Sequence, residues 1–429
     1  MLIYSHTVST RLKYICKFIF QEQLGTDFSL TIDREIFSNY DGPKINYSDV
    51  VMEGHVLNLQ NHSLLFETNI AEKNIECFET NNYKAFFKTS DSDLAFDIFA
   101  AAFYLLSRYE EYLPHQKDMY GRYAFQNSLA HKEGFLEQPL INRWINHFAE
   151  ILKQKFPIII IQQPTFKHIP TYDIDIAWSF KGKGLLRNIG GFIKSPSLER
   201  ISVLARLKKD PFDSYSFLKE LHSRCDMNPV YFFLVATSRS IYDKNISPYD
   251  YRMWRLIKKH AKLYSIGLHP SWKSNEKPDL VKKEKKILET AAGIPVPTSR
   301  QHYIKFSLPD TFQTLLDNNI TDDYSMGYGS INGFRASVAS SFFWYNLQTE
   351  TPTTLRIHPF CFMDANSFYE QKQNAEESYS ELLHYYHACK KINGQLITIF
   401  HNNFLGTNKS YAGWKEMYEK FISQLPQQL

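Results

Sequence analysis

Apolar and polar residues follow two alternating periodicities over residues 165–429. Short runs that are apolar at almost every position are typical of buried strands, and they precede or include residues 171–175, 230–235, 265–271, 355–359 and 395–403. Between most of these runs, apolar residues recur at helical spacing and predict helices near 249–262, 279–291, 309–318, 375–392 and 411–424. Strands that alternate with helices favour a parallel sheet or an α/β barrel.

Most of these runs, together with two further segments at 299–303 and 322–328, end in or carry polar residues of types used in catalysis. In parallel sheets and barrels, functional side chains collect at the C-terminal ends of strands. Six ends of this kind in one chain are difficult to obtain by chance. The side chains concerned are Asp173, Asp175, His269, Arg300, His302, Asp322, Asp323, His358 and His401.

Residues 171–175 read TYDID and place two carboxylates two positions apart, directly after an apolar run. In an extended strand, side chains at i and i+2 point to the same side, so Asp173 and Asp175 share one face if the strand continues through them. Two like charges so close together need a cation, a shared proton or a substrate group to compensate them. A metal site, an acid–base pair and a turn in which both carboxylates cap backbone amides all fit this pattern.

The order of the motifs resembles that of the polysaccharide deacetylases, which are carbohydrate esterase family 4 and carry the NodB-homology domain. Residues 171–175 are similar to a D-x-D variant of the family's first motif, T-F-D-D-G. Residues 269–273, HPSWK, are similar to its second motif, H-[ST]-x-x-[HST], and residues 399–401, IFH, to the L-x-H of its last. The resemblance implies that residues 163–429 form a distorted (β/α)7 barrel.

The resemblance also implies roles for individual residues. Asp173 would act as the general base, and Asp175 and His269 would be metal ligands. Arg300 would orient the base, and His401 would act as the acid. The implied activity is removal of acetyl groups from an N-acetylated sugar of a cell-envelope or capsular polysaccharide, or of its precursor. The implied cofactor is a divalent metal, for which we expect zinc.

Position 273 departs from the family's second motif, because it holds lysine where the motif has histidine, serine or threonine. A catalytic divalent ion usually needs three protein ligands and one open position, and Asp175 with His269 gives only two. His302 is the candidate for the third ligand, and on one strand it would share a face with Arg300. Alternatively, His302 caps a strand and the metal site is lost. The chain would then be a catalytically degenerate glycan-binding protein of a polysaccharide-assembly system.

Further residues are candidates for contacts with a glycan substrate. A loop around Gly327 and Gly329 reads as flexible and substrate-facing, although glycines also serve simply to shape loops. In the family, a strand near 358–364 lines the acetyl pocket and supports the arginine through an aspartate, a role that would fall to Asp364. The candidates for substrate contact are Trp272, Tyr328, Phe360, Asp364 and Asn402.

Composition limits the broad class of the protein. The 429 residues are 43% hydrophobic, which is enough for a large core and two domains. The formal net charge of +4 is too small to indicate nucleic-acid binding. Five dispersed cysteines without a C-x-x-C spacing fit reduced thiols, and no signal peptide is visible, so we expect a cytoplasmic location.

Residues 1–162 are expected to form a separate α+β domain. A helix-like run near 9–24 is followed by strand-like segments at 28–37, 54–67 and 83–88, and by helices near 95–112 and 139–155. Residues 107–112, SRYEEY, resemble a run in an uncharacterised domain that precedes deacetylase-like domains in bacterial sequences. We expect the Arg/Glu cluster of this run to be a solvated helix end in preference to a buried interdomain network.

Residues 181–210, directly after the first predicted barrel strand, combine basic and apolar residues. Eight lysines or arginines are opposed only by Glu199 and Asp210. At the rim of an active site, such a segment could make a peripheral contact with anionic membrane lipid or hold a phosphorylated glycan carrier. We favour a lid whose apolar face packs on the barrel while its lysines are solvated.

Overall fold

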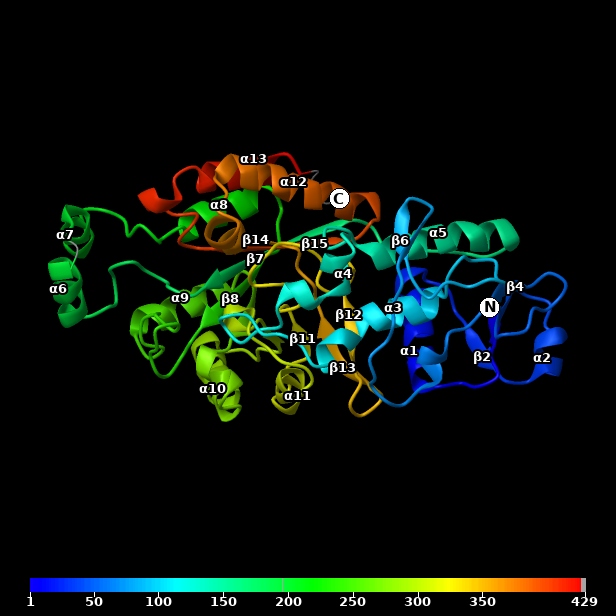
Figure 1. Ribbon diagram of the computed structural model, residues 1–429. Coiled ribbons are helices and arrows are strands. Elements are labelled where there is room, and N and C mark those ends of the chain that lie inside the picture. The colour runs from blue at the N-terminus through cyan, green and yellow to red at the C-terminus, as the bar shows by residue number, and fades with distance from the viewer. Residues whose placement is uncertain (195, 426–429) are drawn as a thin grey trace.

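The computed structural model describes residues 1–194 and 196–425, which build one large and two small β-sheets (Figure 1). All nine strands of the large sheet come from residues 163–429. They are β7 (Lys167–Ile174), β8 (Val230–Leu234), β9 (Ser265–His269), β10 (Thr298–Ser299), β11 (Asp322–Asp323), β12 (Phe342–Asn346), β13 (Thr351–Ile357), β14 (Phe362–Met363) and β15 (Gln395–His401).

The strands of the large sheet have the order β12-β13-β11-β10-β9-β8-β7-β15-β14. Neighbouring strands run parallel except for β12, which pairs antiparallel with β13. The predicted α/β fold with a parallel sheet is therefore confirmed. Within the described residues the sheet is open, because no ladder joins its edge strands β12 and β14. The predicted barrel is thus not closed by hydrogen bonds.

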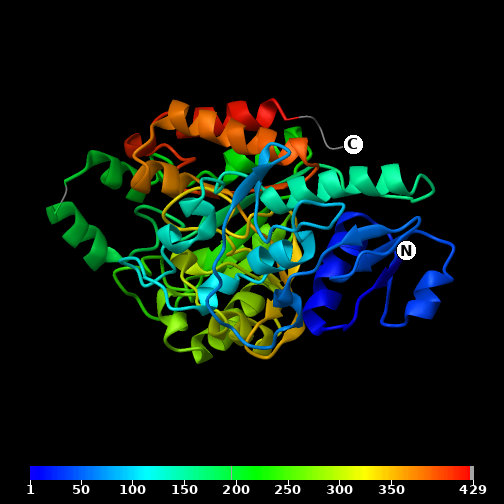
Figure 2. The same cartoon turned by 45° about the vertical axis from the view of Figure 1, so that its right-hand side comes forward.

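Helices cover both faces of the large sheet. Figure 2 shows the same layers as Figure 1, with α8, α12 and α13 on one side of the sheet and α9, α10 and α11 on the other. Burial on both faces explains why β8 is apolar at every position and fully buried. All five predicted helices of this part are confirmed, and α8 is an additional helix that covers the sheet. The six are α8 (Tyr215–Arg224), α9 (Tyr251–Ala261), α10 (Asp279–Ala292), α11 (Asp310–Asp317), α12 (Ala375–Lys391) and α13 (Trp414–Ser423).

The N-terminal part contains a four-stranded parallel sheet, with the order β2-β1-β3-β4, and the two-stranded hairpin β5-β6. The strands are β1 (Leu2–Tyr4), β2 (Ser29–Thr31), β3 (Lys44–Tyr47), β4 (Leu57–Leu59), β5 (Phe78–Thr80) and β6 (Tyr83–Ala85). The helices are α1 (Thr10–Cys16), which continues as a π-helix over Lys17–Gln23, α2 (Arg34–Ser38), α3 (Ile98–Leu106), α4 (Leu129–Lys132) and α5 (Leu140–Lys155). In the described part of the chain, no helix is long and apolar enough to cross a membrane.

Most elements predicted for the N-terminal part are present, some of them in shortened form. The segment 28–37 is a strand only over Ser29–Thr31, because the side chain of Asp33 caps the N-terminus of α2 and starts a helix there. The segment 54–67 is a strand only over Leu57–Leu59. In the segment 28–37, helix capping by Asp33 therefore outweighed the strand-like pattern of the sequence.

Side chains of the N-terminal part bind the antiparallel edge of the large sheet. Arg11 in α1 donates through Nε to Glu350 Oε2 at 2.9 Å, at the turn between β12 and β13. Tyr14 Oη donates to the carbonyl oxygen of Phe343 at 2.7 Å. A single apolar core cluster contains residues of both parts, from Ile3 near the N-terminus to Ile422 in α13. The two parts therefore share a buried interface.

Residues 108–111 belong to a buried ion-pair network, so the prediction of a solvated helix end is wrong. Glu111 Oε1 accepts from Arg108 Nε at 2.7 Å, and its two oxygens accept from Arg335 at 2.8 and 2.6 Å. The Glu111 and Arg335 side chains are only 3% and 2% exposed. Burial raises the pKa of Glu111, but the two guanidinium groups outweigh it and lower that pKa to about 2. The network joins the N-terminal part to the loop that precedes β12.

Glu111→Gln should lower the free energy of unfolding by about 3–5 kcal/mol at neutral pH, because it leaves Arg335 buried without its counter-charge. The folded pKa of Glu111 lies below the unfolded value of about 4.3. The stabilisation by Glu111 is therefore complete above the unfolded value and is lost as the pH falls towards 2. Urea unfolding at a series of pH values should show the wild type and the variant converging in acid.

The matched control is Glu79→Gln, which removes an exposed partner of Lys84. It should change stability by less than about 0.5 kcal/mol at any pH, since exposed ion pairs contribute little. Equal small effects of the Glu111 and Glu79 variants would contradict the role given to the buried network.

Candidate metal and acid–base site

The two carboxylates at the end of β7 reach the same imidazole, although the strand ends at Ile174, before the second carboxylate. His269, at the end of β9, has its Nε2 3.8 Å from Asp173 Oδ2 and 3.1 Å from Asp175 Oδ1. The predicted convergence of these three side chains is confirmed. The carboxylate pair is therefore part of a larger polar cluster and not a self-contained turn.

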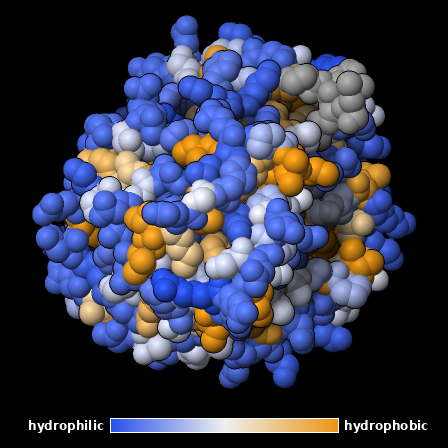
Figure 3. Space-filling view, turned by 90° about the vertical axis from the view of Figure 1, so that its right-hand side faces the viewer, coloured by the Kyte–Doolittle hydropathy of each residue, from blue (hydrophilic) through white to orange (hydrophobic). Residues whose placement is uncertain are grey.

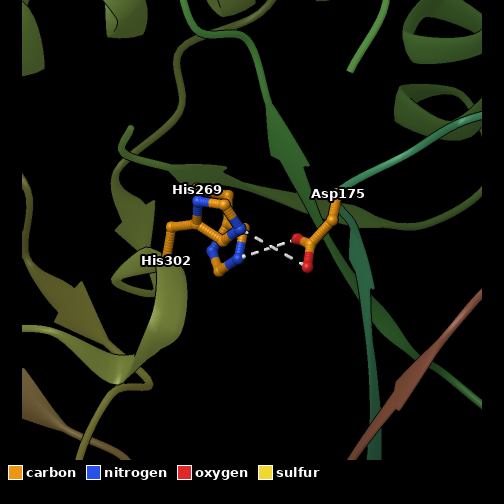
Figure 4. Close-up of side chains that lie close together, drawn as sticks. All are labelled: Asp175, His269 and His302. Atoms are coloured by element: carbon orange, nitrogen blue, oxygen red, sulfur yellow. Dashed lines mark ion pairs between the residues drawn. The ribbon is translucent and has the colours of Figure 1, made fainter. Parts of the chain in front are cut away.

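Asp175, His269 and His302 form a group with the composition of a metal centre (Figure 4). One ligand atom of each residue lies within 4.8 Å of the other two. Asp175 Oδ2 is 3.5 Å from His302 Nε2. Both histidines are buried, whereas the Asp175 side chain is 26% exposed, so the group is reached from solvent on the aspartate side.

His302 reaches this group from a short 3₁₀ turn, His302–Ile304, and not from a strand. Because β10 ends at Ser299, the expectation that His302 shares a strand face with Arg300 is wrong. Tyr303 and Ile304 in this turn have φ values of 59° and 54°. Non-glycine residues adopt such values only where the surrounding structure imposes them, and they concentrate at functional sites.

Each histidine of the group is oriented through its second ring nitrogen. His269 Nδ1 lies 2.5 Å from the carbonyl oxygen of Arg300, and His302 Nδ1 lies 3.2 Å from Asp243 Oδ1. A ring that donates from Nδ1 leaves Nε2 available to a cation. Asp243 was not indicated by the sequence, because it lies in an irregular loop after β8 and not at a strand end.

The geometry between His269 and Asp175 tests whether a cation suits the site. A carbonyl oxygen only accepts hydrogen bonds, so the proton of a neutral His269 sits on Nδ1 and the lone pair of Nε2 faces Asp175 Oδ1 at 3.1 Å. That oxygen is buried and forms no hydrogen bond within the described residues. Two acceptors face each other favourably only with a proton or cation between them. Two imidazoles and one carboxylate are a donor set that suits zinc.

Lys273, at the position that departs from the second motif, lies outside this group. Its Nζ is 3.5 Å from Ser238 Oγ.

Burial raises the pKa of Asp175, but His302 and His269 outweigh it and hold that pKa well below its usual range. The ionised carboxylate that a metal requires is therefore already the favoured form.

Arg300, directly after β10, holds the other carboxylate. Its Nη1 donates to Asp173 Oδ1 at 2.9 Å and to Thr171 Oγ1 at 2.7 Å, and its Nε donates to the carbonyl oxygen of Tyr324 at 3.0 Å. Both members of the ion pair are buried, and the guanidinium lies 4.3 Å from the Phe232 ring centroid. A buried pair with this many hydrogen bonds fixes the direction of both groups. Oδ2 of Asp173 is left facing the histidine group.

His401 and Asp364 form a second oriented pair. His401 lies opposite Asp173 in the ladder between β15 and β7. Asp364 accepts from His401 Nδ1 at 2.6 Å and from its backbone N–H at 2.7 Å, so that Nε2 lies 3.5 Å from Asp175 Oδ2. Burial lowers the pKa of His401, but Asp364 outweighs it and raises that pKa to about 10. Asp364 thus supports His401, which corrects the expectation that it supports Arg300.

Four of the five side chains predicted to contact substrate are buried, and their contact with a substrate stays a prediction. They are Tyr328, Phe360, Asp364 and Asn402. Asn402 instead donates from Nδ2 to two backbone carbonyl oxygens, at 3.1 and 2.8 Å, and so fixes loops beside His401. Trp272 is half-buried and remains accessible.

Trp272 belongs to a group of aromatic side chains that the sequence pattern did not reveal. Its ring stacks on Tyr242 with 3.9 Å between centroids. Tyr303, the neighbour of His302 in the chain, lies 5.4 Å from Tyr120 by ring centroids. All four rings are half-buried. Because Tyr120 comes from the N-terminal part, both parts of the chain contribute to the surroundings of the site.

Comparisons with known proteins divide along the chain. A family of unknown function (DUF7033) matches residues 1–157, and no curated protein matches the sequence. A structure described as a polysaccharide deacetylase of Mycobacterium smegmatis is similar, with a TM-score of 0.40 and 13% identity, over 61% of this chain and 84% of that one. Another polysaccharide deacetylase structure, from Pseudomonas aeruginosa PAO1, has a TM-score of 0.38 and 11% identity over 60% of this chain and 84% of that one. The structure of BA3943, a CE4 family pseudoenzyme of Bacillus anthracis, has a TM-score of 0.31 and 10% identity. That similarity covers 60% of this chain and 61% of BA3943.

His302→Ala should weaken zinc or cobalt binding by more than about 100-fold, as should His269→Ala and Asp175→Ala, because loss even of a group that orients a ligand costs about 10–100-fold. Calorimetry gives the affinity, and the cobalt absorption spectrum reports the ligands. His384→Ala, which removes an exposed histidine of α12, is the matched control and should bind like the wild type. Tight binding by the His302 variant together with weak binding by the His269 variant would make His302 structural.

Metal binding should strengthen as the pH rises. Burial lowers the pKa of His302, but Asp175 and Asp243 outweigh it and raise that pKa to about 9 in the metal-free protein. A proton must leave His302 before it can coordinate, so the affinity should rise about tenfold per pH unit near neutrality and level off above pH 9. Calorimetry in buffers of different ionisation enthalpy should record proton release on binding. An affinity that does not change with pH would contradict ligation by His302.

Proposed function

We propose that the protein is a metal-dependent hydrolase that removes acetyl groups from an N-acetylated sugar of a cell-envelope or capsular polysaccharide, or of its precursor. The observation that carries this proposal is the position of the three-ligand group next to two oriented proton-transfer groups. Asp173 lies 3.8 Å from His269, and His401 lies 3.5 Å from Asp175. Amide hydrolysis needs an activated water, a base and an acid, and these residues are of the required types.

The first half of the reaction falls to Asp173. A divalent ion held by Asp175, His269 and His302 would supply the Lewis acidity that makes water a competent nucleophile near neutral pH. Arg300 occupies Oδ1 of Asp173, so Oδ2 is the atom placed to accept the proton that the water loses. The ion pair with Arg300 fixes the direction of the Asp173 carboxylate before substrate arrives.

The second half falls to His401. Asp364 accepts the hydrogen bond from Nδ1 and stabilises the imidazolium, so Nε2 is the atom that gives a proton to the departing amine. The amide C–N bond breaks, and the products are acetate and the free amine of the sugar. Because His401 lies opposite Asp173 in the ladder, base and acid sit on adjacent strands.

A carbohydrate substrate is supported by the aromatic side chains beside the metal group. Tyr120, Tyr242 and Tyr303 are half-buried and offer apolar ring surface that carries hydroxyl groups, which suits the mixed apolar and polar faces of a sugar ring. Trp272 and Tyr242 stack on each other, which covers one face of each ring, and Lys305 Nζ lies 3.9 Å from the Trp272 centroid. Sugar contact is therefore expected mainly from Tyr120 and Tyr303.

Acetate release from oligosaccharides of N-acetylglucosamine, measured with and without added zinc or cobalt, tests the proposed activity. We expect release that requires the added metal and stops with a chelator. Inactivity with every metal, together with saturable binding of the same oligosaccharide, would identify a glycan-binding protein instead.

Asp173→Asn should retain the metal and lose turnover by about 10²–10⁴-fold, because an amide cannot accept the proton of water. His401→Ala should behave in the same way through loss of the acid. The matched control is Asp322→Asn, which changes another strand-end aspartate that pairs with His358 outside the metal group. Kinetics and metal content should be measured on the same preparations. Loss of metal in the Asp173 variant would show that this residue is a ligand and not the base.

A further inference from the structure

Two helices, α6 (Leu185–Lys194) and α7 (Leu198–Leu204), stand apart from the body of the molecule at one end (Figure 1). Together with their flanking residues, 181–210, they are called the α6–α7 hairpin here. The side chains of Leu185, Leu186, Arg187 and Lys194, and the whole of Ser195, lie outside the described part of the chain.

Large apolar side chains of the α6–α7 hairpin are exposed, which contradicts the expected lid with its apolar face on the barrel. In α7, Leu198, Ile201 and Leu204 recur at helical spacing and form one exposed row, while Val203 is buried. The most exposed side chains are Leu198 at 82%, Leu207 at 80% and Ile193 at 76%. Among the hairpin side chains that the structure describes, the exposed large apolar ones are Ile189, Phe192, Ile193, Leu198, Ile201, Leu204 and Leu207.

The α6–α7 hairpin is also strongly basic in its effective charge. It contains eight lysines and arginines and two acidic residues. One of the acidic residues, Asp210, is buried and accepts hydrogen bonds from four backbone N–H groups, so it adds little negative charge to the surface. Arg206 and Lys208 are exposed next to Leu207. Exposed apolar side chains beside exposed cations are the combination that binds the surface of an anionic bilayer.

The base of the α6–α7 hairpin is fixed to the edge of the sheet that carries the candidate site. Asp210 binds the N–H groups of Ser179, Phe180 and Lys181 at 2.7–3.1 Å, which clasps the incoming and outgoing segments together. Asn402, the neighbour of His401, donates to the carbonyl oxygen of Phe212 at 2.8 Å. The hairpin therefore projects from the rim of the site on an anchored base.

We propose that the α6–α7 hairpin binds the surface of membranes that contain anionic lipid. Its exposed leucine, isoleucine and phenylalanine side chains enter the boundary between headgroups and acyl chains, and its arginines and lysines lie near lipid phosphates. On the opposite end of the molecule, which faces the viewer in Figure 3, apolar residues lie among hydrophilic ones. Binding places the rim that carries Asp175 beside the bilayer. Membrane binding by the hairpin does not depend on the proposed acetyl-removing activity.

The experiment is co-sedimentation of the full chain with vesicles of equal parts phosphatidylglycerol and phosphatidylcholine, compared with phosphatidylcholine alone. We expect strong binding only to the anionic vesicles. Arg206→Glu with Lys208→Glu should weaken binding at least tenfold, since each basic residue near the surface contributes about fivefold. Ile193→Ser with Leu198→Ser and Leu207→Ser should also weaken it at least tenfold, through loss of apolar insertion.

The matched controls change equally exposed residues elsewhere. Ile158→Ser with Ile160→Ser removes two exposed apolar side chains, and Lys258→Glu with Lys259→Glu reverses two exposed charges of α9. Both double variants should bind vesicles like the wild type. Equal binding to neutral and anionic vesicles, no binding to either, or unchanged binding of the hairpin variants would overturn the proposal. So would a vesicle-free dimer that the triple serine variant abolishes in sedimentation velocity, because a second copy would then cover the surface.

Discussion

The carboxylate of Asp175 is the group on which the candidate site depends, because imidazoles from three strand ends or adjoining turns converge on it. His269 lies 3.1 Å from one oxygen, and His302 and His401 lie 3.5 Å from the other. In the metal-free protein, Asp175 favours the protonated form of two of these imidazoles: against the effect of burial, the pKa of His302 is raised to about 9 and that of His401 to about 10. The entry of a divalent ion would exchange some of these protons for a cation.

The strand ends could be predicted because the apolar runs of a sheet buried on both faces are continuous in the sequence, and parallel strands deliver their ends to one edge. Asp173, His269 and His401 are indicated in this way. Asp243 is not, because it lies in an irregular loop and acts through a contact with a histidine 59 residues later. The partner of Asp364 also depends on strand order, which the periodicity of the sequence does not reveal: β14 lies beside β15, whereas four strands lie between β14 and β10.

For two segments the sequence predicts the wrong environment, and the reason is the same. Local sequence specifies whether a segment forms a helix or a strand, but not which other segment packs against it. The charged residues at 108–111 are expected in solvent because burying an unpaired charge is costly, but Arg335, 224 residues from Glu111, removes that cost. The apolar residues at 189–207 are expected in the core because such side chains are usually buried. Within the described residues, nothing covers their outer row.

The position of the α6–α7 hairpin narrows the form in which a glycan could reach the site. Asp175 is followed within a few residues by residues 179–181, whose backbone N–H groups bind Asp210 at the base of the hairpin. The side chain of Asn402, next to His401, binds the carbonyl oxygen of Phe212 at the other end of that base. A bilayer bound by the hairpin would therefore lie on the side of the molecule that carries the partly exposed Asp175. A glycan attached to a lipid carrier is already confined to that surface, so it meets the site at a far higher local concentration than a free polymer would. This geometry favours a lipid-linked precursor over the finished polysaccharide as the substrate of the proposed activity.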